Sequence, residues 1–145
     1  METIGRQLYL AYRRNHDRID EAMGAVGGSL PQWIVLKTVG DMPDMSQREL
    51  ADALSLAGST LTHHLDRMEA DGYLARTRDA QDRRVVRVSL TAAGKHRRAE
   101  LDAIVQAHDR RVQQLLGERD AKQLRRLLAR LRQQLDDGGS ADDHH

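Results

Sequence analysis

The stretch from Ser46 to Gly72 constrains the fold most, because it holds two short helical patterns joined by a segment too short for a free loop. Ser46 has the character of a helix N-cap, and Glu49 three residues later would complete a capping box. Residues 55–58 contain a glycine and fit the corner of a helix–turn–helix. Gly72 is expected to end the second helix, since glycine takes a positive φ at little steric cost.

The second of these helices is expected to present a polar face. Its apolar residues Leu61, Leu65 and Met68 follow an i, i+4, i+7 spacing and share one side. Ser59 or Thr60 is expected to cap its start. The outward side chains are hydroxyls, an imidazole and charged groups: Ser59, Thr60, Thr62, His63, Asp66 and Arg67. Short donors and acceptors near a helix N-terminus suit readout of a DNA major groove, although this helix alone leaves an ordinary solvated face as an equal alternative.

A cationic hairpin is expected directly after this helix. Residues 85–90 alternate apolar and polar side chains with the period of a strand, and residues 74–78 supply its partner. Between Arg76 and Arg87 there are five arginines (76, 78, 83, 84 and 87) against two aspartates (79 and 82). An arginine at the tip of such a wing suits a minor groove, where the negative potential of DNA is concentrated.

These segments together resemble the MarR family of winged-helix regulators. The matching residues are Leu50, Ala51 and Leu54, the run Ser59–Leu74, the wing tip Asp82-Arg83-Arg84, and Val88–Thr91 with Gly94. The resemblance covers residues 30–101 well, and the outer helices only by length and pattern. It implies a homodimer made by interlocked N- and C-terminal helices. It also implies that Asp82 braces the Arg84 that enters the minor groove, with Arg83 near phosphate.

The predicted DNA contacts lie on the second helix and on the wing: Ser59, Thr60, Thr62, His63, Arg67, Asp82, Arg83 and Arg84. His63 and His64 are about 100° apart on a helix, so both cannot enter one groove equally. His63 is the better candidate, and His64 is expected to pack on the first helix of the motif or to touch a phosphate. Arg78 and Arg87 are expected to support the base of the wing or to meet the DNA backbone.

The composition excludes several classes of protein but does not identify one. The 145 residues suffice for one domain with a core. The formal charge is +1, from 23 basic and 22 acidic residues, so only the local distribution of charge points to nucleic acid. The absence of cysteine excludes thiol chemistry. No apolar run approaches the roughly 20 residues that span a bilayer, and no signal pattern begins the chain, so we expect a cytoplasmic protein without membrane contact.

The remaining pattern is helical. Helices are expected over residues 1–26 and 30–40, and a long helix capped by Thr91 is expected to run to a break at Gly117. A leucine seam of period near 3.5 follows: Leu124, Leu127, Leu128, Leu131 and Leu135. The predicted fold is mainly α with a small β-hairpin wing, in a single winged-helix domain over 1–136. Residues 1–29 and 92–136 would be dimerisation helices, 30–91 the DNA-binding winged helix–turn–helix, and 137–145 a disordered tail.

The apolar stripes of the outer helices predict association. Left alone, each stripe would face water, and a two-fold dimer is the simplest closure. Two copies of the DNA-reading helix about one turn of duplex apart would read a pseudo-palindromic operator. With what the resemblance to the MarR family implies, the predicted function is a repressor that a small-molecule effector releases from double-stranded DNA.

The sequence also offers candidate residues for a ligand site and for a metal site. Tyr12, His16, Trp33 and His108 are proposed to line a cleft for an apolar or aromatic-acid-like effector, although core packing is the simpler role for Trp33. His96 and Glu100 are spaced i, i+4, and with His16 or His108 they leave a zinc-responsive regulator as an alternative. No metal or cofactor is predicted. The terminal His144-His145 is set aside as a possible tag remnant.

Two other classes fit the sequence less well. It contains no phosphate-binding loop, nucleophile elbow or dinucleotide-binding glycine pattern, so no enzymatic activity is predicted. A winged helix that binds a protein instead of DNA is a further alternative. Its partner surface would favour apolar anchors over the polar helix and cationic wing seen here.

Overall fold

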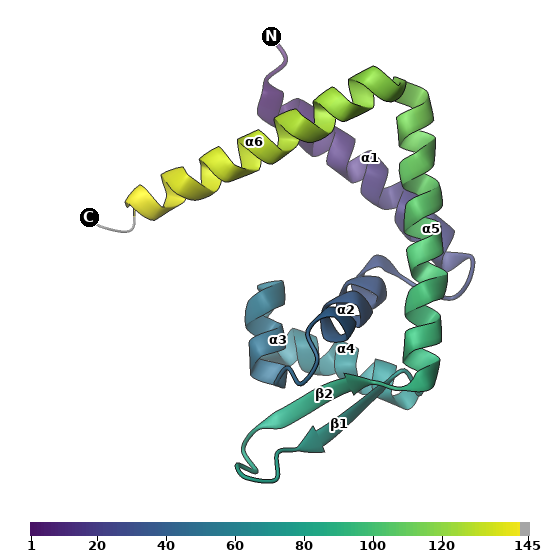
Figure 1. Cartoon of the computed structure of the whole chain (residues 1–145), viewed down its shortest axis with the longest axis vertical. Helices are drawn as coiled ribbons and strands as arrows, with labels where there is room; N and C mark the ends of the chain where they lie inside the picture. The colour runs from purple at the N-terminus through teal and green to yellow at the C-terminus, as the bar shows by residue number, and fades with distance from the viewer. Residues whose placement is uncertain (143–145) are drawn as a thin grey trace. The chain divides into compact units, whose positions relative to one another are not determined.

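The computed structural model describes the backbone of residues 1–142 and the side chains of residues 1–138. Its elements are α1 (Ile4–Gly24), α2 (Leu30–Asp41), α3 (Gln47–Leu54), α4 (Gly58–Ala70), β1 (Leu74–Arg78), β2 (Val86–Leu90), α5 (Ala92–Leu116) and α6 (Glu118–Asp142) (Figure 1). This order confirms the predicted mainly α winged helix–turn–helix. The chain divides into two compact units, residues 1–105 and residues from 106 onward. The predicted single domain over 1–136 stays a prediction.

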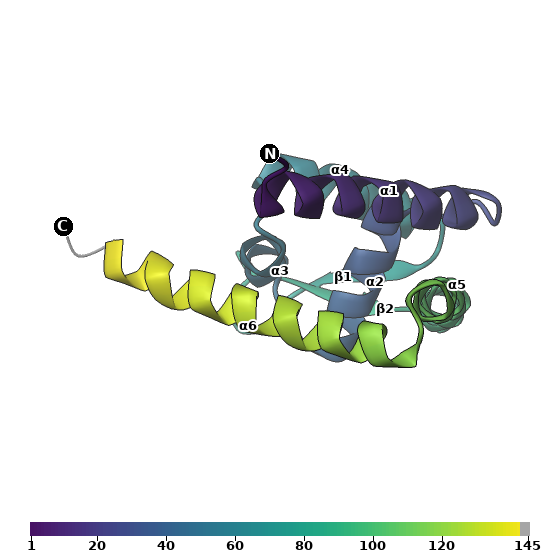
Figure 2. The same cartoon turned by 90° about the horizontal axis from the view of Figure 1, so that it is seen from above.

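The first unit is built around one apolar core. α1, α2, α3, α4, both strands and the first half of α5 all contribute to it. The core residues are Ile19, Met23, Leu30, Val35, Leu36, Val39, Met45, Leu50, Leu61, Leu65, Met68, Leu74, Val88 and Leu101. α2 packs against β2, and the two lie side by side in both views (Figures 1 and 2). Trp33 lies half-buried at the edge of this core, as its packing role predicted.

The hairpin is antiparallel, with Leu74 opposite Leu90 and Arg78 opposite Val86. Val88 is buried while Ser89 beside it is exposed, which confirms the period of two. Ser46 forms a single bridge with Arg87. The start of α3 is thereby attached to the wing, a contact that the sequence of the connector did not reveal.

Helix ends agree with the sequence at most positions. The hydroxyl of Ser46 accepts from the amide of Glu49 (3.1 Å), and that of Thr91 accepts from the amide of Gly94 (3.0 Å). Gly72 and Gly117 have positive φ (83° and 87°) at the ends of α4 and α5.

The start of α4 differs from its prediction. α4 begins at Gly58 with Ala57 as N-cap, and no side chain caps it. Ser59 and Thr60 therefore lie inside the first turn, so the prediction that one of them caps the helix was wrong. The turn itself uses Ser55 in the left-handed region (φ 53°), where a glycine would have been the easier residue.

The C-terminal helix is longer than the sequence suggested. α6 continues through Asp142, whereas composition predicted a disordered tail from Asp137. Once a helix is nucleated, each further residue adds one hydrogen bond, so a polar segment can extend a strongly amphipathic helix. Residues 143–145, including His144 and His145, lie outside the described part of the chain. No helix in the described part has the length and apolar character needed to cross a membrane.

A buried arginine joins several elements of the first unit. Arg97 on α5 donates to the carbonyl of Val26 (2.8 Å) and to the amide oxygen of Gln32 (3.1 Å), and it pairs with Glu100. Its guanidinium lies over the ring of Tyr73, 5.7 Å from the centroid. Since only 8% of Arg97 is exposed, these partners replace the water that a buried cation loses.

Gly94 should not tolerate a larger residue. A Cβ at this position would lie 2.0 Å from the carbonyl oxygen of Tyr73, which is backbone and cannot rotate away. We expect Gly94→Ala to lower the free energy of unfolding by about 1–3 kcal/mol or to prevent folding. Gly24→Ala, a helical position with open space, is the matched control and should be neutral or slightly stabilising. Urea unfolding at one fixed protein concentration measures both, and equal midpoints would contradict the expectation.

Candidate nucleic-acid interface

The outer face of α4 has the predicted polar side chains. Ser59, Thr60, His63 and Arg67 are exposed, while Leu61, Leu65 and Met68 are buried beneath them. His64 is half-buried and its ring centroid lies 6.2 Å from that of His63, so the two imidazoles differ in access as their helical spacing requires. The structure thus brings four of the five predicted α4 contacts to one solvent-facing surface.

Thr62, the fifth, has a different environment. It is half-buried, and its hydroxyl donates to the carbonyl of Gly58 one turn earlier (2.8 Å). The same oxygen accepts from the side-chain amide of Gln47 on α3 (3.0 Å). The sequence pattern does not distinguish Gln47 from an ordinary surface side chain. Its position at the first turn of the first helix of a helix–turn–helix was the available signal.

The wing tip has the geometry that the resemblance implied. Asp82 accepts from the backbone amide of Arg84 (3.1 Å) and from the guanidinium at Nε (3.1 Å) and Nη2 (3.3 Å). The hydrogen bond from the Arg84 guanidinium lowers the pKa of Asp82, and the Arg84 amide adds to this. The Arg84 side chain is nevertheless 91% exposed, so it is oriented but not covered. Arg83 beside it is exposed.

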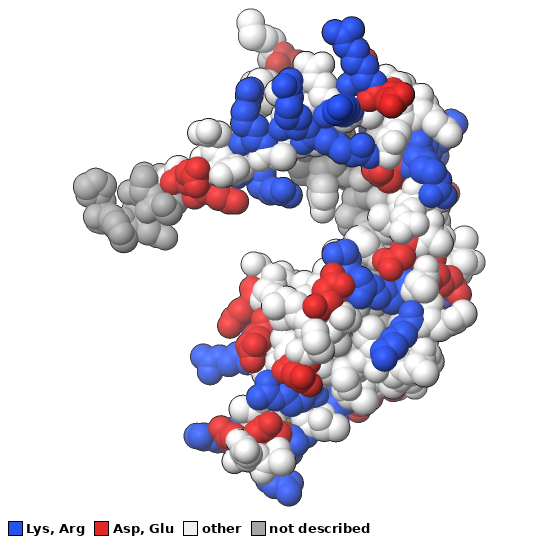
Figure 3. Space-filling model, in the orientation of Figure 1, with Lys and Arg blue, Asp and Glu red and all other residues white. Residues whose placement is uncertain are grey.

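Two other arginines, Arg78 and Arg87, hold the wing through contacts within the protein. Arg78 donates to the carbonyl of Arg83 (2.9 Å), and Arg87 donates to the carbonyl of Asp44 (2.8 Å) and lies 3.6 Å from Asp79. The pKa of Asp79 is lowered mainly by the backbone amide of Asp82. Both arginines therefore support the hairpin from within the protein, although Arg78 does so at the tip and not at the predicted base. Blue and red side chains are interspersed over the hairpin at the bottom of Figure 3.

Arg76 joins the wing to α4. It donates to Asp66 (2.6 Å) and to Glu69 (2.9 Å), and the hydrogen bond to Glu69 is the main cause of its raised pKa. From the sequence, Arg76 is only one of the five arginines that make the hairpin cationic. In the structure it neutralises the acidic side chains that α4 would otherwise present beside Arg67.

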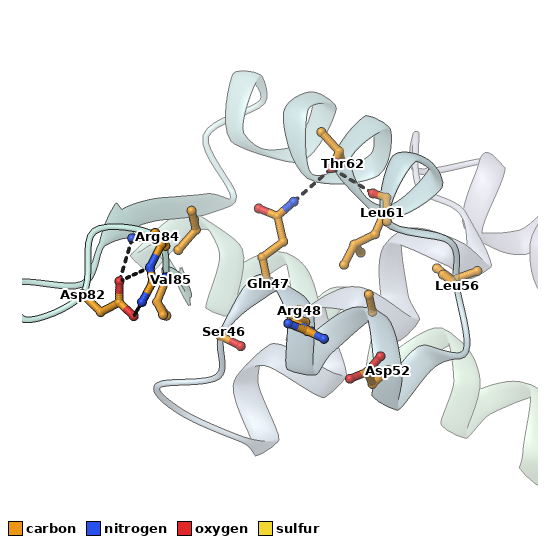
Figure 4. Close-up of a pocket in the computed structure, with 13 residues that line it drawn as sticks. Ser46, Gln47, Arg48, Asp52, Leu56, Leu61, Thr62, Asp82, Arg84 and Val85 are labelled. Atoms are coloured by element: carbon orange, nitrogen blue, oxygen red, sulfur yellow. Dashed lines mark hydrogen bonds and ion pairs between the residues drawn. The ribbon is translucent and has the colours of Figure 1, made fainter.

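A pocket opens between α3, the start of α4 and the wing tip. Its volume is about 840 Å³, and its lining includes Gln47, Arg48, Asp52, Thr62 and Arg84. Figure 4 shows Gln47 reaching up to Thr62 from α3, with Asp82 and Arg84 on one side and Asp52 on the other. This cavity lies at the predicted DNA-binding surface and contains none of the predicted effector residues.

The effector candidates are not brought into one described cavity. Tyr12 and His16 are neighbours on α1, with ring centroids 5.7 Å apart, and Tyr12 is 63% exposed. The indole nitrogen of Trp33 donates to Asp102 (2.8 Å). His108 belongs to the second unit. Among the described residues, no group of three or more His, Cys, Asp or Glu side chains could hold a metal ion.

Both units carry exposed apolar side chains on their helices. On α1 these include Ile4 and Tyr9, which are 76% and 56% exposed. On α6 they are four of the five predicted seam residues, Leu124, Leu127, Leu128 and Leu135, all at least 37% exposed, while Leu131 is half-buried. Large apolar side chains repeated at one helix face favour burial against another chain.

Comparison with known proteins finds similar sequences. Residues 29–86 match the model of the MarR family. The HTH-type transcriptional repressor Rv2887 of Mycobacterium tuberculosis (strain ATCC 25618 / H37Rv) is 28% identical over 126 residues, covering 85% of this chain and 91% of that protein.

Solved structures of similar proteins have the same fold. The transcriptional repressor CouR, bound to a 23-mer DNA duplex, superposes with a TM-score of 0.82 at 28% identity, over 89% of this chain and 92% of that one. The apo form of wild-type MarR from E. coli superposes with a TM-score of 0.80 at 23% identity, over 90% and 98% of the two chains, and shows the fold alone.

At the wing tip, Arg84→Ala should raise the pKa of Asp82 toward the ordinary aspartate value of about 3.9, because the guanidinium that stabilises the carboxylate is lost. In the wild type the lowered pKa keeps the Asp82 carboxylate ionised even when the pH has fallen to the ordinary aspartate pKa of about 3.9. Its bonds to Arg84 are lost only as the pH falls through the lowered pKa. A carboxyl-carbon NMR titration measures this shift. Asp79 is the internal control and should keep its pKa, and an unchanged Asp82 would contradict the expectation.

Proposed function

We propose that this chain is a homodimeric transcriptional regulator of the MarR type that binds a specific sequence of double-stranded DNA, which its similarity to the MarR family model and to known repressors supports. It acts in the cytoplasm as a repressor that a small-molecule effector releases. The family is one of transcriptional regulators and not a class of enzymes. The observation that carries the proposal is the wing tip, where an almost fully exposed Arg84 is held in one orientation by Asp82.

The proposed contacts follow from exposure and chemistry. The α4 face enters the major groove with Ser59, Thr60, His63 and Arg67, and Thr62 lies at its edge. Hydroxyl, imidazole and guanidinium groups supply both donors and acceptors there. Arg84 enters the neighbouring minor groove, and Arg83 meets phosphate. Holding Arg84 before binding reduces the side-chain entropy that the complex would otherwise lose.

The start of α4 supports the same orientation toward DNA. No side chain caps this helix, so its first-turn amides remain available to an anion. The helix dipole also favours negative charge at this end. A DNA phosphate beside Gly58 and Ser59 would satisfy both conditions, so the absence of a capping side chain fits a function in DNA binding.

The proposed regulator also has an effector site. Tyr12, His16, Trp33 and His108 remain its candidate residues, with an apolar or aromatic-acid-like ligand. In the mechanism proposed, such a ligand favours a dimer whose two wings are spaced wrongly for the operator. Adding aromatic acids to a preformed protein–DNA complex and following release by fluorescence anisotropy tests this part. Compounds that bind the protein without changing its DNA affinity would contradict it.

The DNA-binding proposal is tested with duplexes from the upstream region of the chain's own gene. We expect a pseudo-palindromic footprint that survives excess random DNA. Arg84→Ala and Arg67→Ala should each weaken binding by about 1–2 kcal/mol, roughly 5- to 30-fold. Arg18→Ala removes an exposed cation from α1 and is the control. Unchanged affinity in both Arg67→Ala and Arg84→Ala would contradict the proposal. Equal binding of the wild-type protein to operator and random DNA would also contradict it.

The proposed dimer is tested on the α6 seam. Leu128→Glu places a charge at a half-exposed seam position, and burying it against a second chain would be costly. We expect this variant to be monomeric, or to dimerise at least tenfold more weakly, by sedimentation equilibrium. Gln133→Glu introduces the same residue at an exposed position on the opposite side of α6 and should leave the dimer intact. A wild-type protein that sediments as a monomer would overturn the dimer.

A further inference from the structure

The pocket between α3, α4 and the wing lies where a strand of bound DNA would pass. In a duplex, a sugar–phosphate strand separates each major groove from the neighbouring minor groove. A helix in the major groove and a wing tip in the adjacent minor groove must therefore lie on opposite sides of one strand. The pocket lies between these two elements, since Thr62 of α4 and Arg84 of the wing both line it.

Its floor is the first turn of α3. Gln47 and Arg48 lie there, and Arg48 is exposed. In Figure 4 both lie between the wing tip and Asp52, which is one helical turn further along α3. Asp82 contributes little free negative charge, because Arg84 already occupies its carboxylate. The end of the pocket nearest the wing therefore offers donors, and the repelling carboxylate of Asp52 lies beyond them.

The hydrogen bonds of the Thr62 hydroxyl determine which end of the Gln47 amide faces it. A threonine hydroxyl has one proton, and in Thr62 this proton goes to the carbonyl of Gly58, which can only accept. Thr62 must then accept from Gln47, so the NH₂ group and not the oxygen of the amide faces it. One hydrogen of that NH₂ is used, and the second remains for another acceptor.

We propose that this pocket seats one phosphate strand of the operator, with Gln47 and Arg48 as phosphate contacts and Thr62 as the positioning residue of Gln47. The inference rests on the proposed function and deepens it. Thr62, which the sequence suggested as a direct contact, then acts through Gln47, because its only donor is already used within α4. Phosphate contacts fix the register of a protein on DNA and carry no base information directly. Base reading is left to the exposed α4 residues.

The test compares Gln47→Ala, Thr62→Val and Thr62→Ser on the operator and on a panel of single-base operator variants. Gln47→Ala and Thr62→Val should each weaken binding by roughly 10- to 100-fold on every duplex alike, as expected for one hydrogen bond to a charged phosphate. Thr62→Ser keeps the hydroxyl and should bind as the wild type does. The double variant Gln47→Ala/Thr62→Val should bind no more weakly than either single variant, because both remove the same contact.

Arg48 is tested by salt dependence. Arg48→Gln should reduce the slope of log affinity against log salt by about 1, whereas Arg18→Gln on α1 should leave the slope unchanged. Thermal unfolding of each variant shows that the protein is folded before its affinity is measured. Loss of preference at one base pair in Thr62→Val but not in Gln47→Ala would overturn the inference, since Thr62 would then read a base. Wild-type affinity in both Gln47→Ala and Arg48→Gln would also overturn it. A wild-type protein without specific DNA binding would instead refute the proposed function.

Discussion

The first unit depends on one crowded contact between distant parts of its main chain. The carbonyl of Tyr73 accepts from the amide of Thr91 (3.1 Å), and the Thr91 hydroxyl donates to the carbonyl of Gly72 (2.6 Å). Gly94 packs against the Tyr73 carbonyl so closely that only hydrogen fits. The end of α4, both ends of the hairpin and the start of α5 are thereby fixed at one point. The position of the wing relative to α4 follows from this contact.

The local structure of this region could be predicted because its signals are local. The spacing of Leu61, Leu65 and Met68 identifies the buried side of α4, and the alternation around Val88 identifies the inner face of β2. Gly72 and Gly117 stand where positive φ is needed. The Asp82–Arg84 brace joins residues two apart, so its geometry follows from a short motif. In each case the partners are neighbours in sequence.

The features that sequence did not reveal involve partners that are far apart in the chain. Gln47 meets Thr62 across the turn of the motif, and Arg76 meets Asp66 and Glu69 from a neighbouring element. Arg97 on α5 gains Gln32 and the carbonyl of Val26 only when α2 and the turn after α1 have packed against it. No periodicity marks such pairs, since either residue alone resembles an ordinary surface side chain. The uncapped start of α4 was missed for a related reason. Capping rules describe an isolated helix, whereas a helix end can be left open for a ligand.

The double ion pair of Arg76 has a consequence for the mechanics of DNA. This one side chain joins β1 to two positions on α4 and so helps to set the distance between the helix and the hairpin. A duplex held by both elements must match that distance through its groove widths and local twist. Base steps that bend or narrow easily would then be favoured even where no side chain touches them. Under the proposed function, part of the operator's sequence preference would be an elastic property of the DNA, selected by a salt bridge that lies within the protein.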